Sequence, residues 1–273
     1  MTRTHEIGSG RARLAAEVVG SGDPVIFLHA NVCDSRMWRA QLDRVGASNQ
    51  AIAYDRRGFG KTRTEKEQFS AVADLMAVID ALADGTPAIL VGCSQGGRVA
   101  VDAALRYPSS VRGLVLISPT VTGAPEAIYP PAIEMLMAEL KQAERIGNLD
   151  RVNAIKAHLF LDGPLHQGRV MGEARELFID MHAMSLRSPP IGSDIDIAPA
   201  FHRLHEISVP TLVIWGDLDF PHIQERCRQI APMMPNASHY VLTGTAHLPS
   251  LDRPADVTRL LTAFIDRCSS RRR

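Results

Sequence analysis

Short apolar runs alternate with longer amphipathic segments through the first 120 residues of the chain. The apolar runs cover 25–28, 51–54, 88–91 and 111–117, and runs of this length are typical of strands buried on both faces of a sheet. Segments with apolar residues at helical spacing follow the first three runs, over roughly 35–45, 71–82 and 97–107. With two further strands expected at 4–7 and 12–19, this alternation predicts an α/β fold, with a mostly parallel central sheet and helices on both faces.

The alternation stops between Pro119 and Pro210. This stretch is mainly helical in pattern, with helices expected at 133–146, 149–160 and 170–184. After Pro210 the alternation resumes, with strands expected at 211–215 and 240–242 and helices at 222–230 and 254–267. We therefore predict a core domain made of residues 1–121 and 207–273, and a helical cap, residues 122–206, inserted over one edge of the sheet.

Composition and charge narrow the classes of partner. The chain has 30 basic and 30 acidic residues, so neither nucleic acid nor a membrane surface is expected as a partner. We expect the final residues, Arg271–Arg273, to be a solvated end. Residues 1–6 lack the apolar core of a secretory signal, and no segment approaches the ~20 apolar residues that span a bilayer. The four cysteines are not closely spaced, so we expect free thiols and a cytoplasmic protein.

Residues 92–96 place a serine between glycines at the junction of an expected strand and an expected helix. The sequence is Gly-Cys-Ser-Gln-Gly, and its context is the one in which a G-x-S-x-G pattern indicates a nucleophile. A tight turn there holds the hydroxyl of Ser94 clear of the sheet, because side chains at the flanking glycines would collide with backbone. The backbone N–H of Gln95, at the helix start, then faces the place where an oxyanion forms. Cys93 is the alternative nucleophile, and we expect it to pack inward instead.

A serine hydroxyl needs a histidine to accept its proton and a carboxylate to orient that histidine. His247 has the best context of the ten histidines, because it lies in a loop after the expected strand 240–242. The strand at 211–215 is followed by two acidic residues, Asp217 and Asp219. Asp219 lies further into the loop and is the preferred acid, whereas Asp217 is expected to cap backbone.

With these residues placed, the chain resembles the α/β-hydrolase superfamily over nearly its whole length. The matching motifs are the oxyanion loop at 28–31, the D-x-R-G-x-G-x-[ST] turn at 55–62, the acid loop at 216–219 and the ending H-x-x-x-L-[ED]-x-P at 247–254. The sequence has Ala30 where glycine is usual in the family. The order of Ser94, Asp219 and His247 along the chain is also the order of that superfamily.

The resemblance implies an enzyme, a serine hydrolase that cleaves a small carboxylic ester or lactone through an acyl-enzyme. The triad would be Ser94, Asp219 and His247, and the backbone N–H groups of Asn31 and Gln95 would form the oxyanion hole. No cofactor and no metal is expected. Candidates for lining the substrate pocket are His29, Ala30, Trp38, Met181, Met184 and Leu248.

Other functions within the fold stay open at this point. A cofactor-free perhydrolase or haloperoxidase-like activity, or hydrolysis of a C–C bond, would use the same triad, although Gln95 stands where that peroxidase branch commonly has methionine. A non-catalytic ligand-binding protein is the alternative of another class. A serine at position 94 argues against haloalkane dehalogenases and epoxide hydrolases, which use aspartate there. The sequence leaves the oligomeric state open, with a homodimer as one option.

Overall fold

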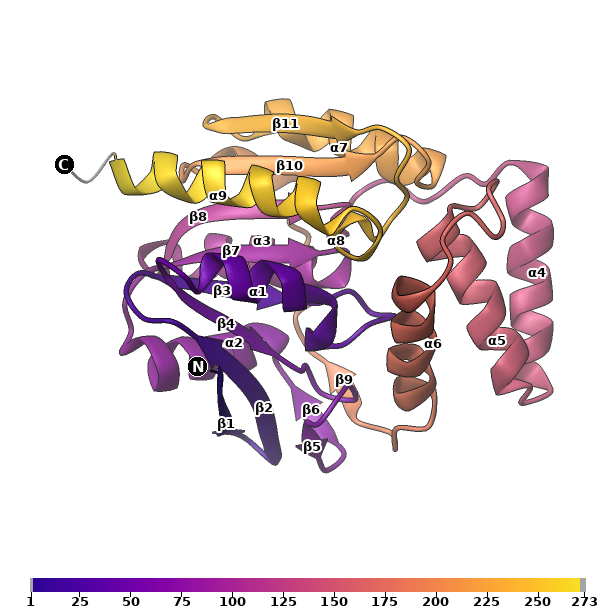
Figure 1. Cartoon of the computed structure of the whole chain (residues 1–273), viewed down its shortest axis with the longest axis horizontal. Helices are drawn as coiled ribbons and strands as arrows, with labels where there is room; N and C mark the ends of the chain where they lie inside the picture. The colour runs from indigo at the N-terminus through magenta and orange to yellow at the C-terminus, as the bar shows by residue number, and fades with distance from the viewer. Residues whose placement is uncertain (1, 271–273) are drawn as a thin grey trace.

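The central element of the computed structural model, which describes residues 2–270, is a twisted sheet whose strands follow one another from β11 at the top of Figure 1 to β1 at the bottom. Within those residues the sheet has nine strands, in the order β1-β2-β4-β3-β7-β8-β10-β11 with β5 beside β2. Strands β4 to β11 of this path pair in parallel with one another, whereas the pairs β1–β2, β2–β4 and β2–β5 are antiparallel. Their bounds are β1 Thr2–Ser9, β2 Ala12–Val19, β3 Pro24–Leu28, β4 Gln50–Tyr54, β5 Arg63–Thr64, β7 Ala88–Cys93, β8 Val111–Ile117, β10 Thr211–Gly216 and β11 Ala237–Leu242.

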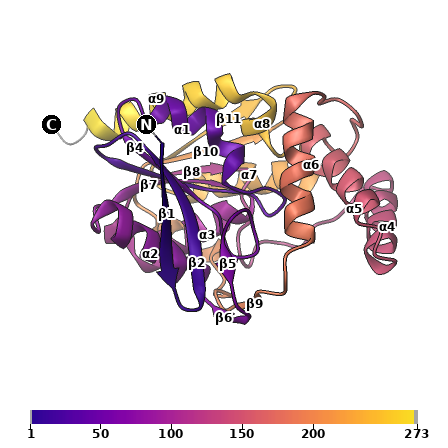
Figure 2. The same ribbon diagram turned by 60° about the horizontal axis from the view of Figure 1, so that its bottom comes forward.

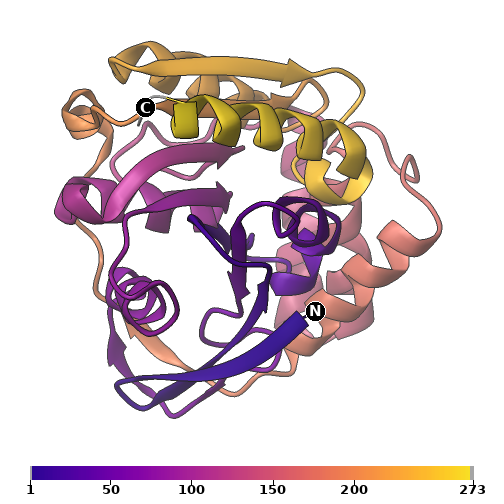
Figure 3. The same cartoon turned by 60° about the vertical axis from the view of Figure 1, so that its left-hand side comes forward.

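Helices cover both faces of the sheet, as the sequence predicts. One face carries α1 (Arg39–Val45) and α9 (Pro254–Ser270), and the other carries α2 (Ala71–Ala83), α3 (Gln95–Arg106) and α7 (Pro221–Met233) (Figure 3). The strands divide their side chains between these layers: in β3, Val25 and Phe27 join one apolar cluster while Ile26 and Leu28 join the other. The two faces therefore have separate cores, and α/β is the observed fold class.

The expected helix starts are present. Asp34 caps the short helix η1 (Ser35–Trp38) by accepting a hydrogen bond from the Arg36 N–H, and Ser70 caps α2 in the same way through the Ala73 N–H. The short helices η2 (Pro108–Ser110), η4 (Phe201–Glu206) and α8 (Pro249–Asp252) complete the connections.

The helices of the predicted cap lie beyond the carboxyl ends of the parallel strands (Figures 1 and 2). They are α4 (Pro131–Arg145), α5 (Leu149–Lys156), the π-helix η3 (Ala157–Asp162) and α6 (Glu173–Leu186). The single helix expected at 149–160 is thus an α-helix that continues as a π-helix. The division into a core and a cap at 122 and 206 stays a prediction.

A second sheet of two strands was not predicted. Strand β6 (Glu67–Phe69) pairs in parallel with β9 (Gly192–Asp194), on the segment that leads from α6 back to the core (Figure 2). Side chains reinforce this junction, since Asp194 is paired with Arg98 of α3 and the Asp196 carboxylate accepts hydrogen bonds from Ser70 and from the Val72 N–H. The segment after α6 is therefore fastened directly to α2 and α3.

Two expectations concern the membrane and the chain ends. In the part of the chain that the structure describes, no helix combines the length and the apolar character needed to cross a membrane. The expectation of a solvated end at Arg271–Arg273 falls outside the described residues, as does Met1.

Candidate active site

Ser94 occupies a tight turn between the end of β7 and the start of α3. Its backbone has φ +53° and ψ −115°, a conformation that residues other than glycine seldom adopt. Three hydrogen bonds hold it there: its N–H donates to the Ile117 carbonyl at 2.9 Å, and its carbonyl accepts from Arg98 and Thr120 at 3.2 and 3.0 Å. The side chain is partly exposed. The turn therefore presents the hydroxyl at the carboxyl end of a central strand.

At the two glycines that flank Ser94 there is no room for a side chain. A Cβ at Gly92 would lie 2.5 Å from the Gly96 carbonyl oxygen, and a Cβ at Gly96 would lie 2.2 Å from the carbonyl oxygen of Leu28. Both contacts are with backbone, which cannot move aside as a flexible side chain can. The predicted collision is confirmed, and it shows that the serine turn is packed directly against the end of β3.

His247 lies in the loop after β11 and is bound to Asp219. Its Nδ1 is 2.9 Å from Oδ2 and 3.0 Å from Oδ1 of Asp219, and both side chains are buried. The Phe220 N–H also donates to Asp219, at 2.7 Å. Asp217 instead accepts a hydrogen bond from the Gly244 N–H at 2.7 Å and is exposed. The geometry thus pairs His247 with Asp219, and Asp217 caps backbone as expected.

The other ring nitrogen of His247 is without a partner. Since the carboxylate can only accept, Nδ1 carries the proton, and Nε2 is left as an acceptor. Nε2 is buried, and no residue in 2–270, Ser94 included, hydrogen-bonds to it. The rings of Phe160 and Phe220 contact the imidazole edge-to-face at centroid distances of 5.2 and 6.4 Å. His247 therefore lies in an apolar environment, and its Nε2 is unpaired among the described residues.

Cys93 is unsuited to be the nucleophile. Its side chain is fully buried, and its thiol donates to the His247 carbonyl at 3.7 Å. Burial raises the pKa of the thiol well above its usual range, with the Asp219 carboxylate adding to the shift. The thiolate is therefore suppressed, and the expectation that Cys93 packs inward is confirmed.

Two backbone N–H groups flank the serine turn with no hydrogen-bond partner among the described residues. One belongs to Gln95 at the first position of α3, and the other to Asn31 in the loop after β3. His29 fixes that loop, because its Nδ1 donates to the Ala30 carbonyl at 2.8 Å and its Nε2 accepts from the Arg56 N–H at 3.0 Å. Burial, aided by the nearby Arg56 charge, lowers the pKa of His29 well below its usual range, so the ring is neutral.

The residues expected to line the pocket mainly pack the core around the site. Trp38 is fully buried with its ring 5.4 Å from that of Phe27, and the Met181 sulfur accepts from the Asp34 N–H. Met184 is 40% exposed at the outer surface. Ala30, His29 and Leu248 are buried.

The cavity beside the serine turn is lined by other residues. It has a volume of about 240 Å³ and includes Asn31 and Gln95 in its wall, but none of the six pocket candidates. Arg56 and Tyr54 line it instead, at the carboxyl end of β4. We did not single out either residue from the sequence. The available signal was their position, since chemistry gathers at the carboxyl ends of parallel strands.

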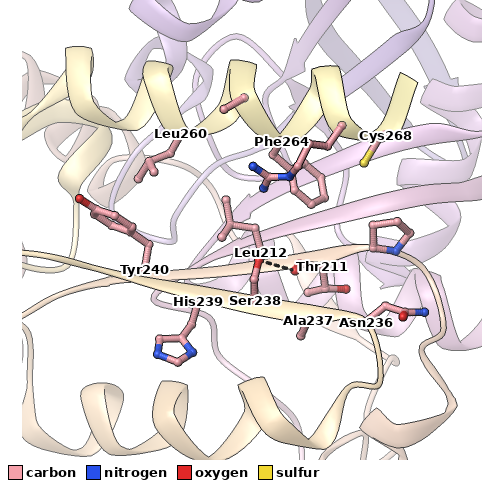
Figure 4. A pocket seen from close by; sticks show the side chains of 13 residues that line it. Thr211, Leu212, Asn236, Ala237, Ser238, His239, Tyr240, Leu260, Phe264 and Cys268 are labelled. Carbon is pink, nitrogen blue, oxygen red and sulfur yellow. Dashed lines mark hydrogen bonds between the residues drawn. The ribbon is translucent and has the colours of Figure 1, made fainter. Parts of the chain in front are cut away.

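Another cavity, of about 640 Å³, lies at the opposite end of the strands. It is formed by the amino-terminal halves of β10 and β11 and by α9, with Leu212 and Phe264 pointing toward one another across it and His239 pointing away (Figure 4). Its wall contains none of Ser94, Asp219 and His247. Because it opens at the amino ends of the strands, it is separate from the site described above.

Comparisons with known proteins agree with the observed fold. The model of the alpha/beta hydrolase family matches residues 25–260. A 2-(acetamidomethylene)succinate hydrolase of Mesorhizobium japonicum is 26% identical, over 96% of this chain and 95% of that protein. A pimeloyl-acyl-carrier-protein methyl ester esterase of a Shewanella species is 28% identical, over 93% and 95%. The solved structure of an esterase from Thermogutta terrifontis superimposes with a TM-score of 0.77 at 24% identity, covering 98% of this chain and 99% of that one.

Proposed function

This chain belongs to the alpha/beta hydrolase family and is a hydrolase of that fold, and we propose that Ser94, His247 and Asp219 are its catalytic triad. The observation that carries the proposal is the state of His247: Nδ1 is held by Asp219 while the buried Nε2 has no partner. A base in this state can accept the proton of a serine hydroxyl. Ser94, at the turn between β7 and α3, is the serine that the fold presents for it.

The reaction follows from these positions. Ser94 Oγ attacks the carbonyl carbon as its proton passes to His247 Nε2, and the resulting oxyanion accepts hydrogen bonds from the N–H groups of Asn31 and Gln95. His247 then gives its proton to the leaving alkoxide, which departs as an alcohol and leaves an acyl-serine. A water molecule, deprotonated by His247, then attacks the acyl carbon. The bond from that carbon to Ser94 Oγ breaks as His247 returns the proton to Oγ, which releases the acid and restores Ser94. Asp219 keeps the imidazole in its tautomer and stabilises the imidazolium form.

The substrate class we propose is a small carboxylic ester or lactone. The named activity of the Shewanella relative is cleavage of a methyl ester, and that of the Mesorhizobium relative is also a hydrolysis. Burial of Cys93 and the positive φ of Ser94 support an oxygen nucleophile, which suits acyl transfer.

The test is a Ser94→Ala variant assayed beside wild type on p-nitrophenyl esters, lactones and β-diketones. We expect ester or lactone hydrolysis to fall by at least about 10³-fold, since only the oxyanion hole and binding remain. Ser109→Ala, which removes an exposed serine hydroxyl, is the matched control and should keep full activity. A labelled fluorophosphonate should modify wild type and Ser109→Ala but not Ser94→Ala. Full activity in Ser94→Ala would overturn the proposal, and peroxide-dependent halogenation or diketone cleavage without ester hydrolysis would overturn the substrate class.

A further inference from the structure

The guanidinium of Arg56 lies in the wall of the cavity beside Gln95, a buried cation without a hydrogen-bond partner among residues 2–270. The residue is 9% exposed, and its Nε and Nη2 are buried with no hydrogen-bond partner among the residues that the structure describes. The guanidinium lies 5.1 Å from the centre of the Phe59 ring. Burial lowers the pKa of Arg56 to about 10, which still leaves it protonated at neutral pH. A cation held this way is costly unless a negative charge comes to it.

The carboxylates that share this cavity wall are bound to other arginines. Asp74 accepts two hydrogen bonds from Arg57, at 2.8 and 2.9 Å, and Asp194 is paired with Arg98. Arg57 also pairs with Glu67. Asp194 still attracts Arg56 at longer range, but it makes no hydrogen bond to it. Of the two arginines in this wall, Arg56 is therefore the one whose guanidinium makes no hydrogen bond to a carboxylate of the described residues, so its N–H groups are available to an anion that enters the cavity.

Tyr54 supplies a second donor to the same cavity. Its hydroxyl is buried and has no hydrogen-bond partner within residues 2–270. Burial raises the pKa of Tyr54 above its usual range, with Asp74 adding to the shift, so the hydroxyl keeps its proton. A guanidinium and a hydroxyl in the wall of one cavity are donors from which a carboxylate can accept hydrogen bonds.

The order of the strands gives the direction in which a substrate extends. Ser94 follows β7, His247 follows β11 on one side of it, and Arg56 follows β4 on the other side. The leaving oxygen must receive its proton from His247, so it points toward β11. The acyl chain then extends the opposite way, past Asn31 and Gln95 and into the cavity that Arg56 lines.

We infer that Arg56 and Tyr54 bind a carboxylate at the far end of the acyl group, so that the preferred substrates are half-esters of short dicarboxylic acids or lactones that carry an acid on the acyl side. This inference rests on the proposed function of Ser94. It assigns Arg56 a role in selecting the substrate, whereas the neighbouring Arg57 is fully occupied by its structural ion pairs.

The experiment compares monomethyl glutarate with methyl hexanoate. Their acyl groups extend equally far, because a carboxylate oxygen of the first takes the place of the terminal methyl carbon of the second, and they differ in the terminal charge. Proton release at constant pH gives kcat/KM for each ester. We expect kcat/KM of wild type to be about 10- to 100-fold higher for monomethyl glutarate, the factor that a hydrogen bond to a charged group contributes. Arg56→Gln should lose that preference while still hydrolysing methyl hexanoate. Tyr54→Phe should lose part of it. Arg39→Gln, which removes an exposed arginine on α1, is the matched control and should keep it.

The outcomes separate this inference from the proposed function. An unchanged ester ratio in Arg56→Gln, with activity retained, overturns the carboxylate site and leaves the serine hydrolase intact. If wild type hydrolyses neither ester, calorimetric titration with glutarate decides: binding by wild type that Arg56→Gln loses supports the site, and equal binding by both overturns it. Inorganic phosphate is titrated in parallel, and Arg56-dependent binding of phosphate that is tighter than that of glutarate overturns the choice of a carboxylate.

Discussion

The imidazole of His247 is bound to both carboxylate oxygens of Asp219, at 2.9 and 3.0 Å, although the two residues are 28 positions apart. The neighbouring carboxylate of Asp217 is turned to the backbone of Gly244 instead. Two acidic residues in one short loop thus have different partners, and substitution of each should have a different consequence.

Asp219→Asn should lower kcat for ester hydrolysis by about 10⁴-fold, because an amide stabilises the wrong tautomer of the histidine. Asp217→Asn removes the same charge from the same loop and should retain activity within about threefold, since a surface substitution costs little. Steady-state kinetics on p-nitrophenyl acetate measures both. Comparable losses in the two variants would contradict the assignment of Asp219 as the acid.

Arg56 and Arg57 are adjacent in sequence and should affect stability in opposite directions. Replacing Arg56 by methionine removes a buried cation without a hydrogen-bond partner, so we expect the free energy of unfolding to rise by about 1 kcal/mol or more. Arg57→Met leaves Asp74 buried without its partner and should cost about 3–5 kcal/mol. Urea denaturation of both variants tests this. A loss of stability in Arg56→Met as large as that in Arg57→Met would mean that Arg56 is a structural residue.

Acid should destabilise the protein through His182. Burial, with a smaller effect of Lys156, lowers the pKa of this histidine to about 4, whereas an unfolded histidine titrates near 6.5. Its contribution to stability is therefore complete above pH 6.5 and is lost as the pH falls toward 4, because the unfolded state binds the proton first. His222, whose pKa burial also lowers to about 4, acts in the same direction.

Unfolding free energies measured by urea at pH 7, 6 and 5 should fall less steeply in His182→Gln than in wild type. His202→Gln, which replaces an exposed histidine, is the control and should keep the wild-type slope. Parallel slopes for His182→Gln and wild type would show that folding does not lower the pKa of His182.

Gly96→Ala should destabilise the fold by about 3 kcal/mol or more, because the new methyl group meets the backbone of Leu28 with no room to relax. Gly147→Ala is the matched control: its Cβ meets nothing within 4 Å, and only its φ of +69° costs energy, about 1 kcal/mol. Thermal unfolding of the two variants gives the comparison. Gly96 is helical and has no positive φ, so a loss no larger than that of Gly147→Ala would contradict the claim that lack of space fixes the glycine at 96.

Local patterns in the sequence were enough to predict the sheet, the layers of helices and the pairing partner of His247. Each of these features is determined by a short stretch of sequence, such as the apolar run 88–91 or the glycines around Ser94. The β6–β9 pair was missed because its strands are three residues long and their paired residues are 125 positions apart. The lining of the cavity was missed for a related reason: whether Trp38 or Arg56 faces it depends on how distant segments pack, which periodicity does not record.

Because Gly96 packs against the carbonyl of Leu28, mutations near the sheet and mutations in the cap helices should have different effects on the oxyanion donors. It joins the turn that carries Gln95 to the loop that carries Asn31 with no space between them, so the spacing of these two N–H groups is set by the sheet alone. The helices α4 to α6 take no part in that contact. Substitutions at exposed positions of α4 and α5 should therefore leave the spacing of the two N–H groups unchanged. A protein engineer who exchanges this segment would have to keep Phe160, which contacts His247, and Met181, which contacts the Asp34 N–H.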